Sequence, residues 1–173
     1  MIKKVVLFGS ESTGKTTLAQ QLAQHYQTVW VPEYARAYLE KKGSICELSD
    51  IEPIGYGQLR LEDEKIKQAN QVLICDTDAR ETKVYSYAYF NTCPESLLKE
   101  VDNRRYDLYL LLNVDIPWMK DSLRDRPHLR NEMHDLFKSE LQKNNLNFIE
   151  IRGDFDSRLK QAIQAIDQLL LKK

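Results

Sequence analysis

Nine residues near the amino terminus, GSESTGKTT, match the spacing G-x-x-x-x-G-K-[ST] at every fixed position. Gly9 and Gly14 allow the backbone angles that wrap a loop around a phosphate, and Lys15 supplies a positive charge for the β- and γ-phosphates. The hydroxyl of Thr16 is a hard oxygen ligand of the kind that Mg²⁺ prefers. An apolar run precedes the motif and a helical pattern follows it, so the loop amides lie at the positive end of a helix. The motif therefore predicts a site for a nucleoside triphosphate, which we take to be ATP, formed by Gly9, Glu11, Ser12, Thr13, Gly14, Lys15, Thr16 and Thr17.

Two acidic residues follow another apolar run, residues 72–75, at the point where a strand would end. The carboxyl ends of neighbouring parallel strands lie at one edge of a sheet, so an acid there reaches the metal of the triphosphate directly or through water. We expect Asp76 to be this metal ligand, together with Thr16. Asp78 either faces the acceptor as a catalytic residue or caps the helix that follows.

Absent motifs narrow the class of nucleotide-binding protein. The sequence has neither the D-x-x-G switch nor the N/T-K-x-D guanine reader of GTPases, and it lacks the LSGGQ signature of transporter ATPases. Asp76 is followed by Thr77, not by the glutamate that activates water in many ATPases. Phosphoryl transfer to a small molecule therefore remains, and a module that binds ATP to regulate a partner is the alternative.

The segment VWVPEYARAY contains candidate acceptor residues at the end of a second predicted strand. Glu33 would lie opposite the γ-phosphate, where a carboxylate orients or deprotonates a primary hydroxyl and contributes about 10²–10⁴ in rate. Its alternative role is that of a first-turn acid that complements a helix dipole. Arg36 contacts phosphate or pairs with Glu33, and Tyr34 stacks on a substrate ring or packs in the core. Tyr56 and Gln58 are further candidates for acceptor binding.

Arginines gather in residues 117–131, which follow the apolar run at 108–114. A small-molecule kinase needs a mobile lid whose cations neutralise the transferred phosphoryl group. We expect Arg124 and Arg126 to be catalytic lid residues, and Arg130 to contact the nucleotide. Trp118 either stacks on the nucleotide base or belongs to the core, and a solvated charged face is the alternative to a lid.

Short apolar runs alternate with longer amphipathic stretches along the chain. Leu18, Leu22 and Tyr26 repeat every four residues, and a second helical stripe occupies residues 155–170. This alternation predicts right-handed βαβ units and an α/β, three-layer fold with a five-stranded parallel sheet, in which ligands bind at the carboxyl ends of the strands. Residues 41–53 are polar and irregular, which predicts an acceptor-side loop or a simple connection. The predicted strands are residues 4–8, 29–31, 72–75, 108–114 and 148–151.

Length and charge set the class of protein. The chain has 173 residues, of which 42% are hydrophobic, so we expect one globular domain over residues 1–173. A net charge of -1 argues against a dedicated binder of nucleic acid or membrane surface. Three scattered cysteines fit a reducing compartment, and the apolar runs are too short for a signal peptide or a spanning helix. We therefore expect a cytoplasmic protein.

The motifs in their order along the chain resemble the ribosylnicotinamide kinase domain of NadR-type proteins. The resemblance is carried by GSESTGKTTLA, PEYAR, CDTD and a D-x-P-W-x-x-D-x-x-R segment that begins at Asp115. It implies a P-loop kinase that uses ATP and Mg²⁺ to phosphorylate the 5′-hydroxyl of nicotinamide riboside, giving nicotinamide mononucleotide. Multidomain members of the family add an adenylyltransferase domain, whose H-x-G-H motif is missing here, so the resemblance implies a stand-alone kinase.

One position departs from the family pattern. The family often has a tryptophan directly before the Glu-Tyr pair, where it stacks on the nicotinamide ring, and this sequence has Pro32 there. Trp30 lies two residues earlier on the same strand face and would reach the ring only if the strand ended early. The departure concerns the acceptor base more than the reaction type, so a kinase for another nucleoside-like acceptor is the alternative.

Overall fold

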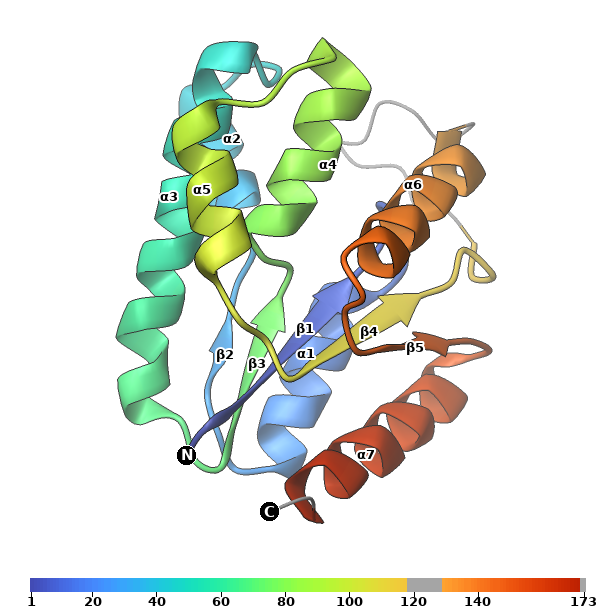
Figure 1. Ribbon diagram of the computed structural model, residues 1–173. Coiled ribbons are helices and arrows are strands. Elements are labelled where there is room, and N and C mark those ends of the chain that lie inside the picture. Colours follow the sequence, from blue (N-terminus) through green and yellow to red (C-terminus); the bar gives the residue numbers. More distant parts are fainter. Residues whose placement is uncertain (118–128, 172–173) are drawn as a thin grey trace.

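The computed structural model describes residues 1–117 and 129–171, and its centre is a five-stranded parallel sheet (Figure 1). The strands lie in the order β2-β3-β1-β4-β5, and each pairs in parallel with its neighbours. The predicted α/β fold with five parallel strands is therefore confirmed. The strands are β1 (Lys3–Phe8), β2 (Trp30–Val31), β3 (Val72–Asp76), β4 (Leu108–Leu112) and β5 (Phe148–Ile151).

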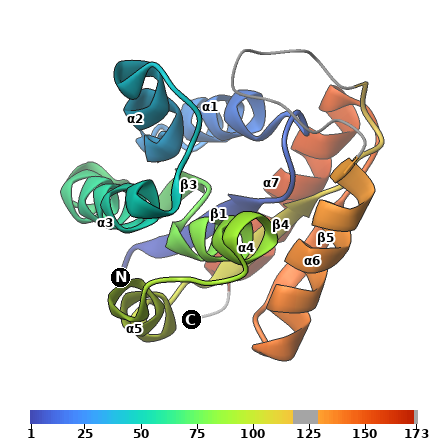
Figure 2. The same ribbon diagram turned by 90° about the horizontal axis from the view of Figure 1, so that it is seen from above.

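Helices cover both faces of this sheet, as the view from above shows (Figure 2). Successive residues of β1 point to opposite faces: Val5 and Leu7 pack with α1 and α7, whereas Val6 and Phe8 pack with α4 and α6. From Val5 to Phe8 in β1 and along the whole of β4 the side chains are buried on both faces of the sheet, which explains why these stretches are almost entirely apolar. The helices are α1 (Lys15–His25), α2 (Tyr34–Lys42), α3 (Leu48–Lys65), the 3₁₀ turn η1 (Ile66–Gln68), α4 (Ala79–Phe90), α5 (Glu95–Asn103), α6 (Arg130–Lys143) and α7 (Phe155–Leu171).

The polar segment 41–53 is less irregular than the sequence predicts. α2 ends at Lys42 and is capped by Gly43, which adopts a left-handed conformation with a φ of 71°, and α3 begins at Leu48. Asp50 organises this start, because its carboxylate accepts hydrogen bonds from the Glu47 amide at 2.8 Å and from the Tyr38 hydroxyl at 3.0 Å. Residues that read as a loop are therefore partly the cap of a long helix.

The fourth strand ends two residues earlier than predicted. β4 stops at Leu112, and the side chain of Asn113 accepts a hydrogen bond from the Val114 amide at 2.7 Å. The bond occupies a backbone amide that a longer strand would use for pairing. The chain then runs along the carboxyl edge of the sheet toward Pro117, where the first described range ends.

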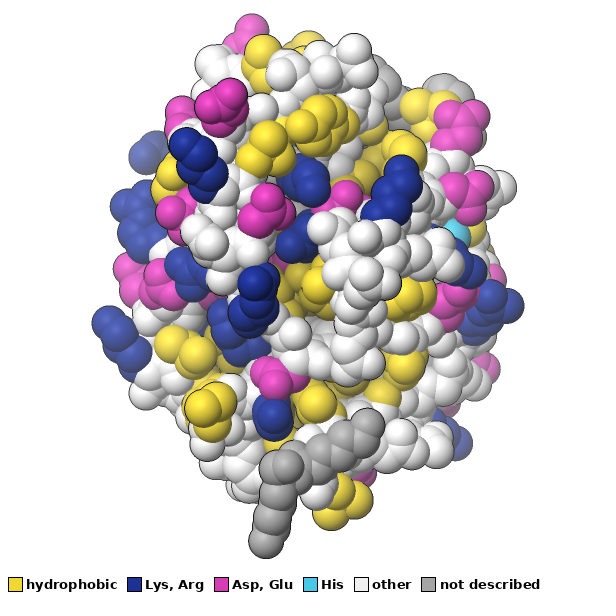
Figure 3. All heavy atoms as spheres, in the orientation of Figure 1, with side chains coloured by type: hydrophobic (Ala, Val, Ile, Leu, Met, Phe, Trp, Pro, Cys, Tyr) yellow, Lys and Arg dark blue, Asp and Glu magenta, His cyan; other side chains and the backbone are white. Residues whose placement is uncertain are grey.

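The surface mixes both signs of charge, as expected from a net charge near zero (Figure 3). Lys and Arg side chains are interspersed with Asp and Glu over the face shown, and they surround a hollow near its upper part. Among the described residues, no helix is both long enough and apolar enough to cross a membrane.

Candidate active site

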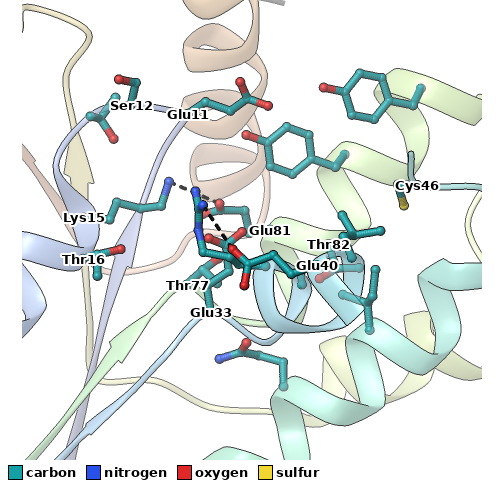
Figure 4. Close-up of a pocket in the computed structure, with 18 of the residues that line it drawn as sticks. Glu11, Ser12, Lys15, Thr16, Glu33, Glu40, Cys46, Thr77, Glu81 and Thr82 are labelled. Carbon is teal, nitrogen blue, oxygen red and sulfur yellow. Dashed lines mark ion pairs between the residues drawn. The ribbon is translucent and has the colours of Figure 1, made fainter. Parts of the chain in front are cut away.

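A cavity of about 1130 Å³ opens at the carboxyl edge of the sheet. Its walls come from the loop between β1 and α1, from α2 and the start of α3, from α4, and from residues near the ends of β4 and β5. Figure 4 shows Lys15 and Thr16 on one side, Cys46 on the other, and Glu33, Thr77 and Glu81 between them. The predicted triphosphate and acceptor residues therefore meet in one space that is large enough for two small ligands.

Two glycines allow the loop between β1 and α1 to curve tightly. Gly9 has a φ of 140° and Gly14 a φ of 83°, both in the region that favours glycine. A β-carbon at Gly9 would lie 2.9 Å from the carbonyl oxygen of Leu112, so the loop packs tightly against the end of β4. Residues 11–17 of the loop and its helix line the cavity, as the motif predicts.

Lys15 lies among hydrogen-bond acceptors on the phosphate-loop side of the cavity. Its Nζ donates hydrogen bonds to the carbonyl oxygens of Gly9 at 2.7 Å and Ser10 at 3.0 Å. It also lies 3.4 Å from Oε1 of Glu81 (Figure 4). Burial alone would lower the pKa of Lys15, but Glu81 and then Glu33 outweigh it and raise that pKa above its usual value. The ammonium is therefore charged at neutral pH.

Thr16 and Asp76 meet where the sequence predicts a magnesium site. The Thr16 hydroxyl donates to Oδ2 of Asp76 at 2.5 Å, while Oδ1 of Asp76 is buried with no hydrogen-bond partner among the described residues. Burial raises the pKa of Asp76 to about 6, and Lys15 opposes that rise. A hydroxyl beside an unsatisfied carboxylate oxygen is a donor set that suits Mg²⁺ shared with phosphate oxygens.

Glu33 lines the cavity from the start of α2. It occupies the N-cap position of that helix, but its side chain makes no capping hydrogen bond. The charge of Glu33 raises the pKa of both Lys15 and Asp76, so its carboxylate lies near these two side chains. Arg36 also lines the cavity, and its guanidinium lies 3.8 Å from Oε1 of Glu40.

The other predicted acceptor residues divide into two groups. Gln58 lines the cavity, and its Oε1 accepts a hydrogen bond from the Tyr34 amide at 2.8 Å. The Tyr34 ring packs instead on Gly57, where a β-carbon would lie only 2.1 Å from the ring. Tyr56 is exposed and is absent from the cavity wall. The structure therefore keeps Gln58 as a candidate and gives Tyr34 a packing role.

Asp78 is turned away from the cavity, which corrects its assignment as a catalytic or acceptor residue. Thr77 adopts a φ of 71°, and this left-handed residue breaks the strand alternation that would place Asp78 beside Asp76. The carboxylate of Asp78 accepts hydrogen bonds from the Glu81 amide at 3.0 Å and the Tyr109 hydroxyl at 2.8 Å. Burial raises its pKa. Asp78 is thus the helix cap that was its alternative role.

Glu81 is the charged cavity residue that the sequence analysis missed. Besides its contact with Lys15, its Oε2 accepts a hydrogen bond from the Gly9 amide at 3.4 Å. Burial raises the pKa of Glu81, and the charge of Lys15 opposes that rise. The sequence signal was the D-x-x-E spacing of Asp78 and Glu81, which indicates only a capping box. The sequence also did not predict the apolar side chains that line the cavity, among them Ile45, Ile51, Ile54, Tyr89 and Phe90.

The predicted lid lies largely outside the described residues. Trp118, Arg124 and Arg126 belong to that part of the chain. Arg130 is described, and it donates hydrogen bonds at 3.1 Å to the carbonyl oxygens of Ser12 and Ile116, so it lies against the phosphate loop. Trp30 packs on the core between the sheet and α1 and does not line the cavity.

The sequence matches a family model described as "AAA domain" over residues 4–158. The chain belongs to this family. The match covers the phosphate loop, all five strands and the start of α7.

Relatives and solved structures extend the comparison over nearly the whole chain. The chain is 30% identical to the "Trifunctional NAD biosynthesis/regulator protein NadR" of Escherichia coli K12 over 98% of its own length, and it spans 43% of that relative. A crystal structure of NadR in complex with NR matches 99% of the chain at 28% identity and a TM-score of 0.83, and the chain covers 52% of it. A crystal structure of NadR with NAD and AMP-PNP matches 99% of the chain at 27% identity and a TM-score of 0.80, with half of that protein covered.

More distant structures support the fold alone. Thymidylate kinase from Ehrlichia chaffeensis matches 95% of the chain, and the chain covers 98% of that protein, at 17% identity and a TM-score of 0.68. The structural neighbours of this chain are therefore P-loop nucleoside and nucleotide kinases, and its sequence resembles the NadR domain as expected.

Proposed function

We propose that this chain is a kinase that transfers the γ-phosphoryl group of ATP to the 5′-hydroxyl of nicotinamide riboside, giving nicotinamide mononucleotide. The observation that carries the proposal is a single cavity with a phosphate loop on one side and Glu33 facing the same space. Similarity over 99% of the chain to a NadR structure that contains NR supports the choice of acceptor.

Lys15 and the loop amides bind the triphosphate in this proposal. The loop amides at the start of α1 form a concave, positively polarised surface for the phosphates. Lys15 is already charged, and its Nζ exchanges the carbonyls of Gly9 and Ser10 for phosphate oxygens. Thr16 and Asp76 would hold Mg²⁺, which neutralises phosphate charge when it is bound.

Glu33 acts on the acceptor. The 5′-oxygen forms a bond to the γ-phosphorus while the bond from that phosphorus to the bridging oxygen of ADP breaks, and the hydroxyl proton passes to the Glu33 carboxylate. Positioning and electrostatics dominate this chemistry, so the carboxylate mainly orients the hydroxyl. Residues 117–131 form the lid in this proposal, and Arg124 and Arg126 neutralise the transferred group.

A second candidate acceptor is a different nucleoside. Pro32 stands where the family often has its ring-stacking tryptophan, and Trp30 packs in the core. The ring of the acceptor would instead meet the apolar side chains that line the cavity, which include Tyr89 and Phe90. These side chains recognise a planar base without specifying nicotinamide.

The test follows ADP release from purified protein given Mg²⁺·ATP and a panel of nucleosides. We expect nicotinamide riboside to accelerate ADP release, and phosphorus NMR to show a new 5′-monoester. Lys15→Ala, purified in the same way, controls for contaminating kinases. If only another nucleoside accelerates ADP release, the proposed reaction type holds and the proposed acceptor is wrong. ATP binding without acceleration by any nucleoside would refute the proposal.

A further inference from the structure

Arg158, in the first turns of α7, is the largest fully buried side chain among the described residues, at 1% exposure. Its guanidinium donates to three backbone carbonyl oxygens: Thr13 at 2.5 Å, Gly153 at 2.7 Å and Asn113 at 2.9 Å. It also pairs with the carboxylate of Asp115. A buried guanidinium is costly unless it is paired and bonded, and here each nitrogen has a partner.

The three carbonyls belong to three separate segments at the carboxyl edge of the sheet. Thr13 lies in the phosphate loop, Asn113 follows β4, and Gly153 lies between β5 and α7. Arg158 belongs neither to the nucleotide motif nor to the predicted acceptor residues. Its bonds instead tie the phosphate loop to the segments that follow β4 and β5.

The hydrogen bond from Arg158 to the Thr13 carbonyl also fixes the direction of the next backbone amide. The described chain has no cis peptide bond, so each carbonyl points opposite to the amide of the next residue. Because Arg158 holds the carbonyl of Thr13, the amide of Gly14 points away from Arg158, and Gly14 lines the cavity. Arg130 holds the carbonyl of Ser12 in the same way and so directs the amide of Thr13.

We propose that Arg158 is a positioning residue that aims the Gly14 amide at the phosphates of the nucleotide, with Arg130 aiming the preceding amide. The inference rests on the nucleotide site of the proposed function and does not depend on which acceptor is used. Gly14, at a φ of 83°, has wide rotational freedom, so an unheld peptide there flips at little cost. Arg158 removes that freedom before the nucleotide arrives, which favours binding.

The chain offers a matched control for this residue. Arg80 is also buried, at 4% exposure, and it also bonds a carboxylate and a carbonyl: Glu140 at 2.7 Å and Val101 at 3.1 Å. These partners lie on α6 and α5, and Arg80 does not line the cavity. Arg80→Met therefore measures the cost of losing a buried arginine without touching the phosphate loop.

The experiment compares ATP binding by the full chain and its Arg158→Met and Arg80→Met variants in titration calorimetry. We expect Arg158→Met to weaken ATP binding by about tenfold or more, the typical size of a lost hydrogen bond to a charged group, while Arg80→Met stays within about twofold of the wild type. Arg158→Lys keeps the charge beside Asp115 but loses the fork of donors, so its affinity should be intermediate.

A spectroscopic readout separates aiming from general stability. Pyrophosphate should shift the Gly14 amide resonance in the wild type and in Arg80→Met, and less in Arg158→Met at saturating ligand. Equal ATP affinity and equal Gly14 shifts in the two methionine variants would overturn the inference. If Arg158→Met does not fold, Arg158→Lys decides, because full affinity in that variant also overturns it. Wild-type ATP binding without phosphoryl transfer would refute the proposed function and leave this inference standing.

Discussion

The charged centre of the candidate site is the contact between Lys15 and Glu81. Two loop carbonyls and Glu81 surround the ammonium group, so its position is fixed by contacts that phosphate oxygens can replace. The nearby carboxylates keep Lys15 charged despite burial. A charge fixed in advance beside the site of transfer needs little reorganisation during the reaction.

Lys15→Ala should abolish transfer while the fold remains intact. Loss of one electrostatic donor at a reacting centre lowers kcat by about 10²–10³, and we expect at least that loss here. ADP release measures the rate and circular dichroism the fold. Lys138→Ala is the control and should retain the wild-type rate, because Lys138 is a half-exposed residue of α6 that pairs with Glu150 of β5 and does not line the cavity.

Glu33→Gln should lower kcat by about 10²–10⁴ and change the KM for ATP little, because in the proposed mechanism the carboxylate acts on the acceptor hydroxyl and not on ATP. Asp78→Asn should instead lower the melting temperature and preserve kcat, since Asp78 caps α4 and bonds Tyr109. Steady-state kinetics and thermal melts of both variants check the pair of outcomes. Normal turnover by Glu33→Gln with an inactive Asp78→Asn would reverse the assignment of the two carboxylates.

At the scale of elements, α3 holds the acceptor side of the cavity in place. The ring of Tyr34, in the first turn of α2, lies on Gly57 of α3. The side chain of Gln58, also in α3, accepts a hydrogen bond from the Tyr34 amide. Because Glu33 directly precedes α2, its position depends on this contact between two helices. The position proposed for Glu33 therefore depends on a glycine whose lack of a side chain makes room for the Tyr34 ring.

Gly57→Ala should impair the acceptor side more than the nucleotide side. Its β-carbon would overlap the Tyr34 ring, so α2 must shift and carry Glu33 with it. We expect kcat to fall about tenfold or more, in keeping with the cost of small displacements at reacting centres, while ATP affinity is retained. Kinetics and ATP titrations check this, with Glu64→Ala in the same helix as control. Unchanged kcat in Gly57→Ala would show that Glu33 does not depend on this contact.

α3 also carries a buried acid that makes stability depend on pH. Burial raises the pKa of Glu62 to about 8, helped by Asp78, while Tyr106, Lys4 and Arg104 act in the opposite direction. The Tyr106 hydroxyl lies 2.9 and 2.8 Å from the two carboxylate oxygens. The folded state therefore retains a proton between about pH 4.5 and 8 that the unfolded chain releases.

Glu62→Gln should remove this pH dependence. The stabilisation from the bound proton is complete below pH 4.5 and is lost as the pH rises through 8, with a slope of at most about 1.4 kcal/mol per pH unit. The difference in unfolding free energy between Glu62→Gln and the wild type should therefore grow in favour of the variant from pH 5 to 8. Urea titrations across that range measure it, and a constant difference would contradict the shifted pKa.

At the scale of the whole molecule, the parallel sheet explains what the sequence could predict. The motif at residues 9–17 and the acid at Asp76 lie in contiguous stretches whose spacing is local, and strand alternation then places both at one edge. Arg158 and Gly57 act through partners far away in sequence, so no local pattern marks them. Asp78 was misplaced because a single left-handed residue, Thr77, reverses the direction of its side chain.

The stability of the whole chain should report on the metal site. ATP at about 100 times its Kd adds about 2.7 kcal/mol to the unfolding free energy, which for a chain of this size raises the melting temperature by roughly 5–10 °C. With Asp76 and Thr16 holding Mg²⁺, the shift should shrink when EDTA replaces the metal, because Mg²⁺ tightens ATP binding. Asp76→Asn should give the same shift with and without Mg²⁺, whereas the exposed control Asp63→Asn should behave as the wild type. A full Mg²⁺-dependent shift in Asp76→Asn would show that the metal binds without the Asp76 carboxylate. The unsatisfied oxygen of Asp76 would then have to bind a different ligand.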